Sequence, residues 1–263
     1  MIALFLLIGV ISGTFAGLLG VGGGLIFLPL AKFYFLDHLG YPSEFLKVII
    51  ATSTAIIVAN SASATIQHHR NRNIDISLLP YFVVACIVGA KLGVVLIDIV
   101  PIPVVKCILT TFLIISSLRI LRKKKPSSDN RILDKKSKIQ IGSVGLLIST
   151  LSSMLGLGGG ALMGPFLNGV FKQSIKKSIG TASMFTLTVS ATACVFYLMQ
   201  PEPQNLTHHL MVGYIDMQIA VLVAAGGIFG SWMGAKLMHR APVTVIQKLF
   251  AVLLIIAALK ITL

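Results

Sequence analysis

The sequence LLGVGGG at residues 18–24 returns as MLGLGGG at residues 154–160, and a proline follows each copy five residues later, at Pro29 and Pro165. Glycine has no Cβ, so it adopts positive φ angles, allows close approach to the backbone and disfavours the interior of a helix. We therefore expect each copy to interrupt a helix and to form a candidate binding tip. The tip residues are Gly20, Gly22, Gly23 and Gly24 in the first copy and Gly156, Gly158, Gly159 and Gly160 in the second.

The composition is that of a chain that spans a membrane several times. Hydrophobic residues make up 56% of the sequence and charged residues 11%, and the mean hydropathy is +0.93. Most apolar stretches have the roughly 20 residues that a spanning helix needs. We predict an all-α polytopic membrane protein.

The similarity between the two halves extends beyond the glycines, because Ile74-Asp75 corresponds to Ile215-Asp216 and the pair Gly89/Gly93 to Gly230/Gly234. The four-residue glycine spacing predicts close packing of helices, and the aspartates, placed before apolar runs, predict helix N-caps. We divide the chain into two repeats joined by a basic linker. The first repeat, 1–121, contains a hairpin at 1–36 and helices at 45–66, 77–98 and 102–121; the linker is 122–138; the second repeat, 139–263, contains a hairpin at 139–171 and helices at 178–199, 214–236 and 243–262.

The formal charge of +14 does not indicate nucleic-acid binding, because half of it lies in one connector. From Arg119 to Lys138 the chain has nine Lys or Arg residues against Asp129 and Asp134, which is net +7. A basic run beside membrane spans marks the cytoplasmic side and attracts anionic headgroups. The linker is therefore expected to face the cytoplasm.

The same rule discriminates between two topologies. Eight full crossings in two parallel repeats would place Lys172, Lys176, Lys177, Lys236 and Arg240 outside, against the positive-inside tendency. If each glycine cluster is instead the tip of a re-entrant hairpin, each repeat has three crossings, the second repeat is inverted, and these residues fall inside. We favour the inverted arrangement, with parallel repeats as the alternative.

In the inverted arrangement the two tips meet near the midplane, and each presents the N-terminus of a short helix. Such an end carries unpaired N–H groups and a positive dipole, and both attract anions. The polar helix beside each hairpin adds hydroxyl and amide groups that can donate to an anion, although the same groups can simply tie helices together. The polar residues of these helices are Thr52, Ser53, Thr54, Asn60, Ser61 and Ser63 in the first repeat and Thr181, Ser183, Thr186 and Ser190 in the second. The candidates for substrate contact are Thr52, Ser53, Asn60, Thr181 and Ser183.

Lys91 is a further candidate, because a basic residue within a span is a functional hypothesis by default; snorkelling of its side chain to the interface is the alternative. The motif GLGGGA at residues 156–161 fits the dinucleotide fingerprint, but no acidic residue follows at the required distance. His68-His69 and His208-His209 have no acidic or cysteine neighbours in sequence. We therefore expect no cofactor, no metal site and no catalytic residues.

The doubled glycine motifs with Pro29 and Pro165, together with the helix starts at 51–53 and 180–183, resemble the TauE/SafE sulfite exporter family. The resemblance covers nearly the whole chain. It implies a transporter in the bacterial inner membrane for sulfite, sulfoacetate or a related sulfonate, with the substrate near the two tips and the Thr52 and Thr181 region. The alternative is a membrane assembly subunit whose glycines serve only for packing, and a homo-oligomer is possible in either case.

Overall fold

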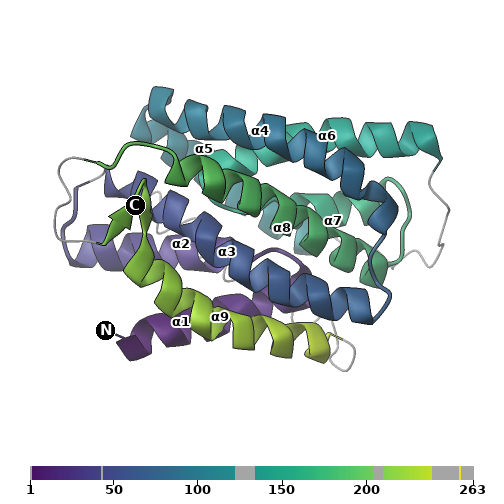
Figure 1. Ribbon diagram of the computed structural model, residues 1–263, viewed down its shortest axis with the longest axis horizontal. Coiled ribbons are helices and arrows are strands. Elements are labelled where there is room, and N and C mark those ends of the chain that lie inside the picture. The colour runs from purple at the N-terminus through teal and green to yellow at the C-terminus, as the bar shows by residue number, and fades with distance from the viewer. Residues whose placement is uncertain (1, 43, 122–133, 204–209, 239–254, 256–263) are drawn as a thin grey trace.

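The computed structural model describes residues 2–42, 44–121, 134–203, 210–238 and 255, and over these ranges the protein is mostly helical (Figure 1). The helices of the first half are α1 (Ile2–Leu19), α2 (Gly24–Lys32), the π-helix η1 (Phe33–His38), α3 (Phe45–Arg70), the 3-10 helix η2 (Ile76–Leu78), α4 (Leu79–Ile99) and α5 (Ile102–Leu121). The second half contains α6 (Lys135–Leu155), α7 (Gly160–Gly169), α8 (Ile175–Leu198), β1 (Met211–Val212), β2 (Ile215–Asp216) and α9 (Met217–Leu237).

Among the described residues, six helical segments are long and apolar enough to cross a membrane. They are α1, α3, the segment formed by η2 and α4, α6, α8 and α9. The protein is therefore a multi-pass helical membrane protein, as the composition predicts. The helix predicted at 243–262 lies outside the described residues, apart from Ile255.

Both glycine clusters interrupt the helical path. Helix α1 ends at Leu19, three of the next four residues have positive φ (Gly20, +68°; Gly22, +80°; Gly23, +84°), and α2 begins at Gly24. The second cluster repeats the pattern between α6 and α7, with φ of +65°, +76° and +78° at Gly156, Gly158 and Gly159. Residues with side chains rarely adopt these angles, which explains why glycine occupies them.

The chain folds back on itself after the first break. The ring of Phe5, near the start of α1, stacks at 6.1 Å on the ring of Phe35, which follows α2. A Cβ on Gly23 would lie 2.8 Å from the carbonyl oxygen of Ser12, two turns before the end of α1. Helices α1 and α2 therefore contact each other on either side of the first glycine cluster.

The helices of the two halves are packed against each other. Figure 1 shows α4 and α6 along one edge of the molecule, α1 and α9 along the other, and α3 and α8 between them, and the same pairs are in contact. Glycines allow the outer pairs to approach closely, since a Cβ at Gly89 would overlap Ser149 of α6, and one at Gly230 would overlap the Val10 carbonyl of α1. The packing role predicted for these glycines is confirmed.

Two boundaries differ from the sequence-based prediction. The linker predicted at 122–138 is shorter, because Lys135–Lys138 belong to α6, whose N-cap Asp134 accepts a hydrogen bond from Ser137 N at 3.1 Å. Hydrogen bonds from Ser137 lower the pKa of Asp134 below its ordinary value. The helix predicted at 214–236 begins at Met217, because the preceding residues form the β1–β2 ladder.

The two aspartates predicted as helix caps differ in structure. Asp216 is a true N-cap, since its carboxylate accepts a hydrogen bond from Ile219 N at 3.0 Å. Asp75 makes no such cap, and the prediction is wrong there. Its carboxylate instead accepts hydrogen bonds from Ser77 Oγ at 2.7 Å and Gln173 Nε2 at 3.3 Å.

Candidate functional site

The two glycine tips lie against each other. A Cβ on Gly24, at the start of α2, would lie 2.5 Å from the carbonyl oxygen of Gly156, and one on Gly160 would overlap the carbonyl of Gly20. Cβ atoms on Gly22 and Gly158 would both meet methyl groups of Ile57 and Thr186 within 3.0 Å. Two segments 136 residues apart in sequence are thus joined in one buried cluster, which we call the tip cluster: residues 20–24 and 156–160 with the side chains that contact them.

Hydroxyl groups from the central helices hold the tips in place. Ser53 Oγ of α3 donates to the carbonyl oxygen of Gly156 at 2.7 Å, and Thr186 Oγ1 of α8 donates to that of Gly20 at 3.2 Å. Each central helix therefore supports the tip that belongs to the other half of the chain. The Ser53 proton that was predicted to contact a ligand is engaged in this bond.

Both short helices present N–H groups toward the tip cluster. The carbonyl oxygen of Gly23 accepts hydrogen bonds from Ile26 N and Phe27 N, and that of Gly159 accepts them from Leu162 N and Met163 N. These are the first hydrogen bonds of α2 and α7. Over the described residues, no acceptor is found for the N–H groups of residues 22–24 and 158–160. Unpaired N–H groups at the positive end of a helix dipole attract anions.

Three buried polar side chains near these N–H groups have no hydrogen-bond partner within the described part of the chain. They are Asn60 (0% exposed), Ser152 (0%) and Ser190 (1%). Asn60 Nδ2 lies 3.0 Å from the position of a Cβ on Gly23, Ser152 Oγ 3.0 Å from one on Gly159, and Ser190 Oγ 3.3 Å from one on Gly158. A buried polar group without a partner costs about 1–3 kcal/mol, so their concentration here makes the tip cluster a candidate binding site.

Sequence reasoning identified Asn60 as a site candidate, named Ser190 only among the polar residues of its helix, and missed Ser152. Ser152 stands at the end of α6, one helical turn before Gly156. It occurs in the segment STLSSML at 149–155, where hydroxyl residues interrupt an apolar arm. That interruption was the available signal.

Comparison with known proteins gives the functional class. The profile of the family described as sulfite exporter TauE/SafE matches residues 5–261. The chain belongs to this family. It is 27% identical to a probable membrane transporter protein of Haemophilus influenzae, over 98% of this chain and 97% of that protein. It is 23% identical to a probable membrane transporter protein of Methanocaldococcus jannaschii, over 91% of this chain and 87% of that protein. No solved structure matches.

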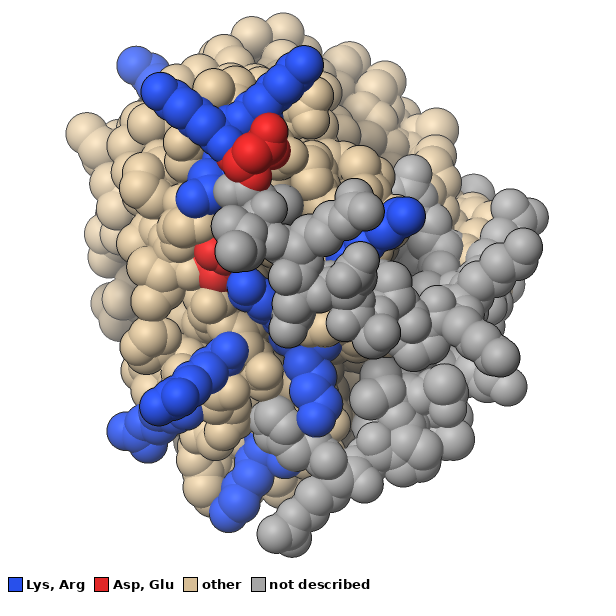
Figure 2. All heavy atoms as spheres, turned by 90° about the vertical axis from the view of Figure 1, so that its right-hand side faces the viewer, with Lys and Arg blue, Asp and Glu red and all other residues tan. Residues whose placement is uncertain are grey.

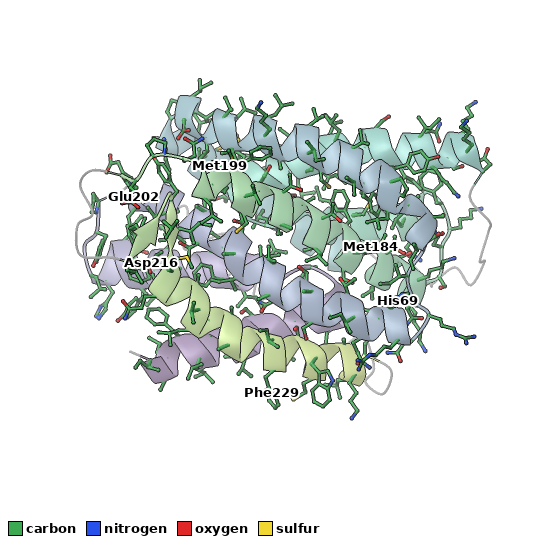
Figure 3. All side chains as sticks on the ribbon, in the orientation of Figure 1. His69, Met184, Met199, Glu202, Asp216 and Phe229 are labelled. Atoms are coloured by element: carbon green, nitrogen blue, oxygen red, sulfur yellow. The ribbon has the colours of Figure 1, made fainter. Side chains whose placement is uncertain are left out.

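The TauE/SafE family is one of membrane transporters, not of enzymes, so the tip cluster has to be considered as a place for cargo rather than for catalysis. The hydroxyl groups of two other predicted residues are engaged outside the tip glycines. Thr52 Oγ1 accepts a hydrogen bond from Asp216 N, and Thr181 Oγ1 accepts one from Asp75 N, each at 3.0 Å. These threonines connect the two halves of this family member near opposite ends of the helices (Figure 3 labels Asp216).

Ser183 and Lys91 are likewise not brought to the glycine tips. Ser183 Oγ donates to the carbonyl oxygen of Gly180 at 2.8 Å and lies 3.3 Å from Thr65 Oγ1. Lys91 is exposed on α4, whereas Gly89 and Gly93 on the buried face of that helix meet α6. Lys91 is exposed because residues two apart on a helix point about 200° apart, so it lies on the face opposite Gly89 and Gly93.

Proposed function

We propose that this TauE/SafE family member carries a small anion across the membrane, bound at the tip cluster. The substrate class is a sulfur oxyanion or sulfonate, such as sulfite or sulfoacetate. One observation carries the proposal: the unpaired N–H groups of two helix N-termini lie beside three buried polar side chains that have no partner in the described structure. An anion would accept hydrogen bonds from both sets and remove the cost of burying them.

We further propose that the two halves are inverted repeats with re-entrant hairpins. Helix α2 has nine residues, about 14 Å at 1.5 Å per residue, and cannot cross a hydrocarbon core of about 30 Å. Figure 2 views the end of the molecule at which α3 ends and α6 and α8 begin, and blue Lys and Arg side chains are spread over it with few acidic ones. This distribution supports assigning that end to the cytoplasm.

The opposite end would face the periplasm of a bacterial inner membrane. Figure 3 shows Glu202 and Asp216 at that end and His69 at the other, and in Figure 1 the N-terminus lies on the Glu202 side. The basic end, with the Lys residues at the start of α6, would then lie against anionic headgroups of the cytoplasmic leaflet. In intact cells, a tag on the N-terminus of the protein should be accessible from outside. A tag that is protected until the cells are lysed would contradict this orientation.

The site is tested by Asn60→Leu in proteoliposomes. Leucine has a similar shape to asparagine, and the Asn60 amide has no partner to lose within the described residues, so the variant is expected to fold. We expect saturable uptake of labelled sulfite or sulfoacetate in the native protein and at least a tenfold reduction in the variant, corresponding to about 1.4 kcal/mol. Unchanged uptake would favour a packing role for the glycine tips, and the absence of uptake in the native protein would contradict transport of these anions.

A further inference from the structure

We infer that a groove between the first turns of α4 and α6 binds one anionic phospholipid. The headgroup lies on the lysines that begin α6, and an acyl chain lies along the groove. The site is separate from the tip cluster, so the inference does not depend on the cargo proposed above. It also differs from a general attraction between the basic end and the membrane, because a lipid in a defined groove remains bound after the bilayer is dissolved in detergent.

The groove lies on the surface of the molecule, near the beginnings of two spanning helices. Tyr81 and Val84 of α4 form one wall, and Ile139 and Leu146 of α6 form the other. Its volume is about 410 Å³, within the range of about 300–1,000 Å³ that is typical of small-molecule sites, and its lining is mainly apolar. Figure 1 shows α4 and α6 side by side, with both helices beginning at the same end of the molecule.

The floor of the groove is formed by close contact between the two helices. Gly142 has no side chain, and the position of a Cβ on it lies 3.3 Å from the Cβ of Tyr81. Further along, a Cβ on Gly89 would overlap Ser149, so the helices touch there and the groove ends. Over residues 139–146 the groove follows α6 for roughly 10 Å, about a third of a hydrocarbon core of about 30 Å. It therefore has room for the part of an acyl chain that is nearest the headgroup.

The walls of the groove belong to the surface that faces lipid. Val84 is 67% exposed and Ile139 is 51% exposed. Ile87 and Val88, on the outer face of α4, are exposed as well. Helices α4 and α6 are both long and apolar enough to cross a membrane, so these side chains contact acyl chains. A phospholipid can therefore enter the groove sideways from the bilayer.

Positive charge lies at the open end of the groove. Lys135 stands four residues before Ile139, and Lys138 stands four residues before Gly142, so both lysines lie about one helical turn from the lining and on the same face of α6. Neither lysine forms an ion pair with another residue of the described ranges. Long lysine side chains reach from a helix to the headgroup level, and an ammonium group binds phosphate.

The acidic residues next to the groove do not cancel this charge. Asp134 is the N-cap of α6 and stands beside three lysines, Lys135, Lys136 and Lys138. Asp75, which precedes η2 and α4, pairs with Lys177 at 3.5 Å. The mouth of the groove therefore carries net positive charge next to an apolar recess. Basic sites between spanning helices of this kind bind anionic lipid headgroups.

Charge complementarity favours a phospholipid over a second copy of the chain. Two copies in one membrane pair about an axis along the membrane normal, so a shared contact at this groove would bring the lysines of both copies to the same depth. Like charges at one depth repel each other. A free phosphate would use the lysines alone and leave the apolar groove unfilled. An anionic phospholipid matches both parts of the site.

The test is native mass spectrometry of the purified protein in detergent. The probes are phosphatidylglycerol and phosphatidylcholine with the same two oleoyl chains, and glycerol phosphate serves as a headgroup without chains. Lys135→Gln with Lys138→Gln removes two charges at the groove, and Lys172→Gln with Lys176→Gln removes two charges elsewhere on the basic end as a matched control. Ser143→Phe fills the groove from an exposed lining position, and Leu147→Phe adds the same ring one turn further along α6, outside the lining.

We expect one phosphatidylglycerol to be retained and phosphatidylcholine to be lost. A basic residue near an anionic headgroup contributes about fivefold in affinity, so the Lys135/Lys138 double variant should bind phosphatidylglycerol at least about tenfold more weakly. Ser143→Phe should show a similar loss, and both controls should bind as the native protein does. The lysine pair is exposed or half-buried and carries the test even if Ser143→Phe alters folding.

Several results would overturn the inference. Equal losses in the Lys135/Lys138 and Lys172/Lys176 variants would indicate a general attraction of the basic end instead of a site. Equal retention of phosphatidylcholine, or thermal stabilisation by glycerol phosphate equal to that by phosphatidylglycerol, would show that the headgroup charge or the chain is not recognised. A change of oligomeric state in Ser143→Phe would assign the groove to a second copy. None of these results bears on anion transport at the tip cluster, which is measured separately.

Discussion

Two serines three residues apart on α6 provide a sharp test of the site. Ser149 and Ser152 are both 0% exposed, and both would be changed to alanine with the loss of a single oxygen atom. Ser149 Oγ lies within hydrogen-bond distance of the carbonyl oxygens of Ala85, at 3.0 Å, and Leu146, at 2.9 Å. Ser152 Oγ has no partner among the described atoms and borders Gly159. Ser149→Ala should therefore lower stability without changing anion binding, and Ser152→Ala should weaken anion binding without lowering stability.

The magnitudes follow from the hydrogen bonds. Ser149→Ala loses one donated bond between helices, worth about 0.6 kcal/mol on average and up to about 1.7 kcal/mol in membrane proteins. Ser152→Ala removes a buried hydroxyl that has no hydrogen-bond partner among the described residues, and burying such a group costs about 1–3 kcal/mol. Without ligand, the variant is therefore expected to be as stable as the native protein or more stable. A bond to a charged ligand is worth about 1.5–3 kcal/mol, so Ser152→Ala should weaken anion binding roughly 10- to 150-fold.

The assay is thermal unfolding of the purified protein in detergent, with and without sulfite, followed by uptake in proteoliposomes. Because 1 kcal/mol corresponds to about 2–4 °C for a chain of this size, Ser149→Ala should lower the unfolding temperature by about 1–7 °C. Its stabilisation by sulfite should be unchanged. Ser152→Ala should show an undiminished unfolding temperature without ligand and lose most of the stabilisation that sulfite provides.

The opposite pattern would refute the reasoning. If Ser152→Ala is as destabilised as Ser149→Ala and binds sulfite as the native protein does, then Ser152 is a structural residue. Its hydroxyl would in that case not belong to the anion site.

Three further predictions concern packing, the connection between the halves and the outward-facing lysine. Gly13→Ala should destabilise the protein by about 1–3 kcal/mol in thermal unfolding, because the added Cβ would overlap the backbone of α9. Gly169→Ala should not, because the space around Gly169 is open, and equal effects of the two substitutions would contradict the close packing. Thr181→Val should cost about 1 kcal/mol by removing the acceptor of Asp75 N, and Thr181→Ser should restore stability, unless that bond contributes nothing. Lys91→Ala should leave uptake and sulfite stabilisation unchanged, and a loss of uptake would return this residue to the site.

Local chain properties account for the features that were predicted correctly. The helix breaks at 20–24 and 156–160 follow from the conformational freedom of glycine, and these residues do adopt positive φ angles there. The close approach at Gly89 and Gly230 follows from small residues spaced by one helical turn. Both properties belong to short segments and are therefore readable without knowledge of their neighbours.

Which polar residues surround the tips was decided by the packing of the helices. In a membrane chain apolar side chains face both lipid and protein, so hydropathy does not reveal which face of a helix is buried. For this reason Lys91 was assigned to the site although it is exposed, and Ser152 was missed although it is buried there. Helices α3 and α8 help to hold the tips of opposite halves together, through the bonds of Ser53 and Thr186.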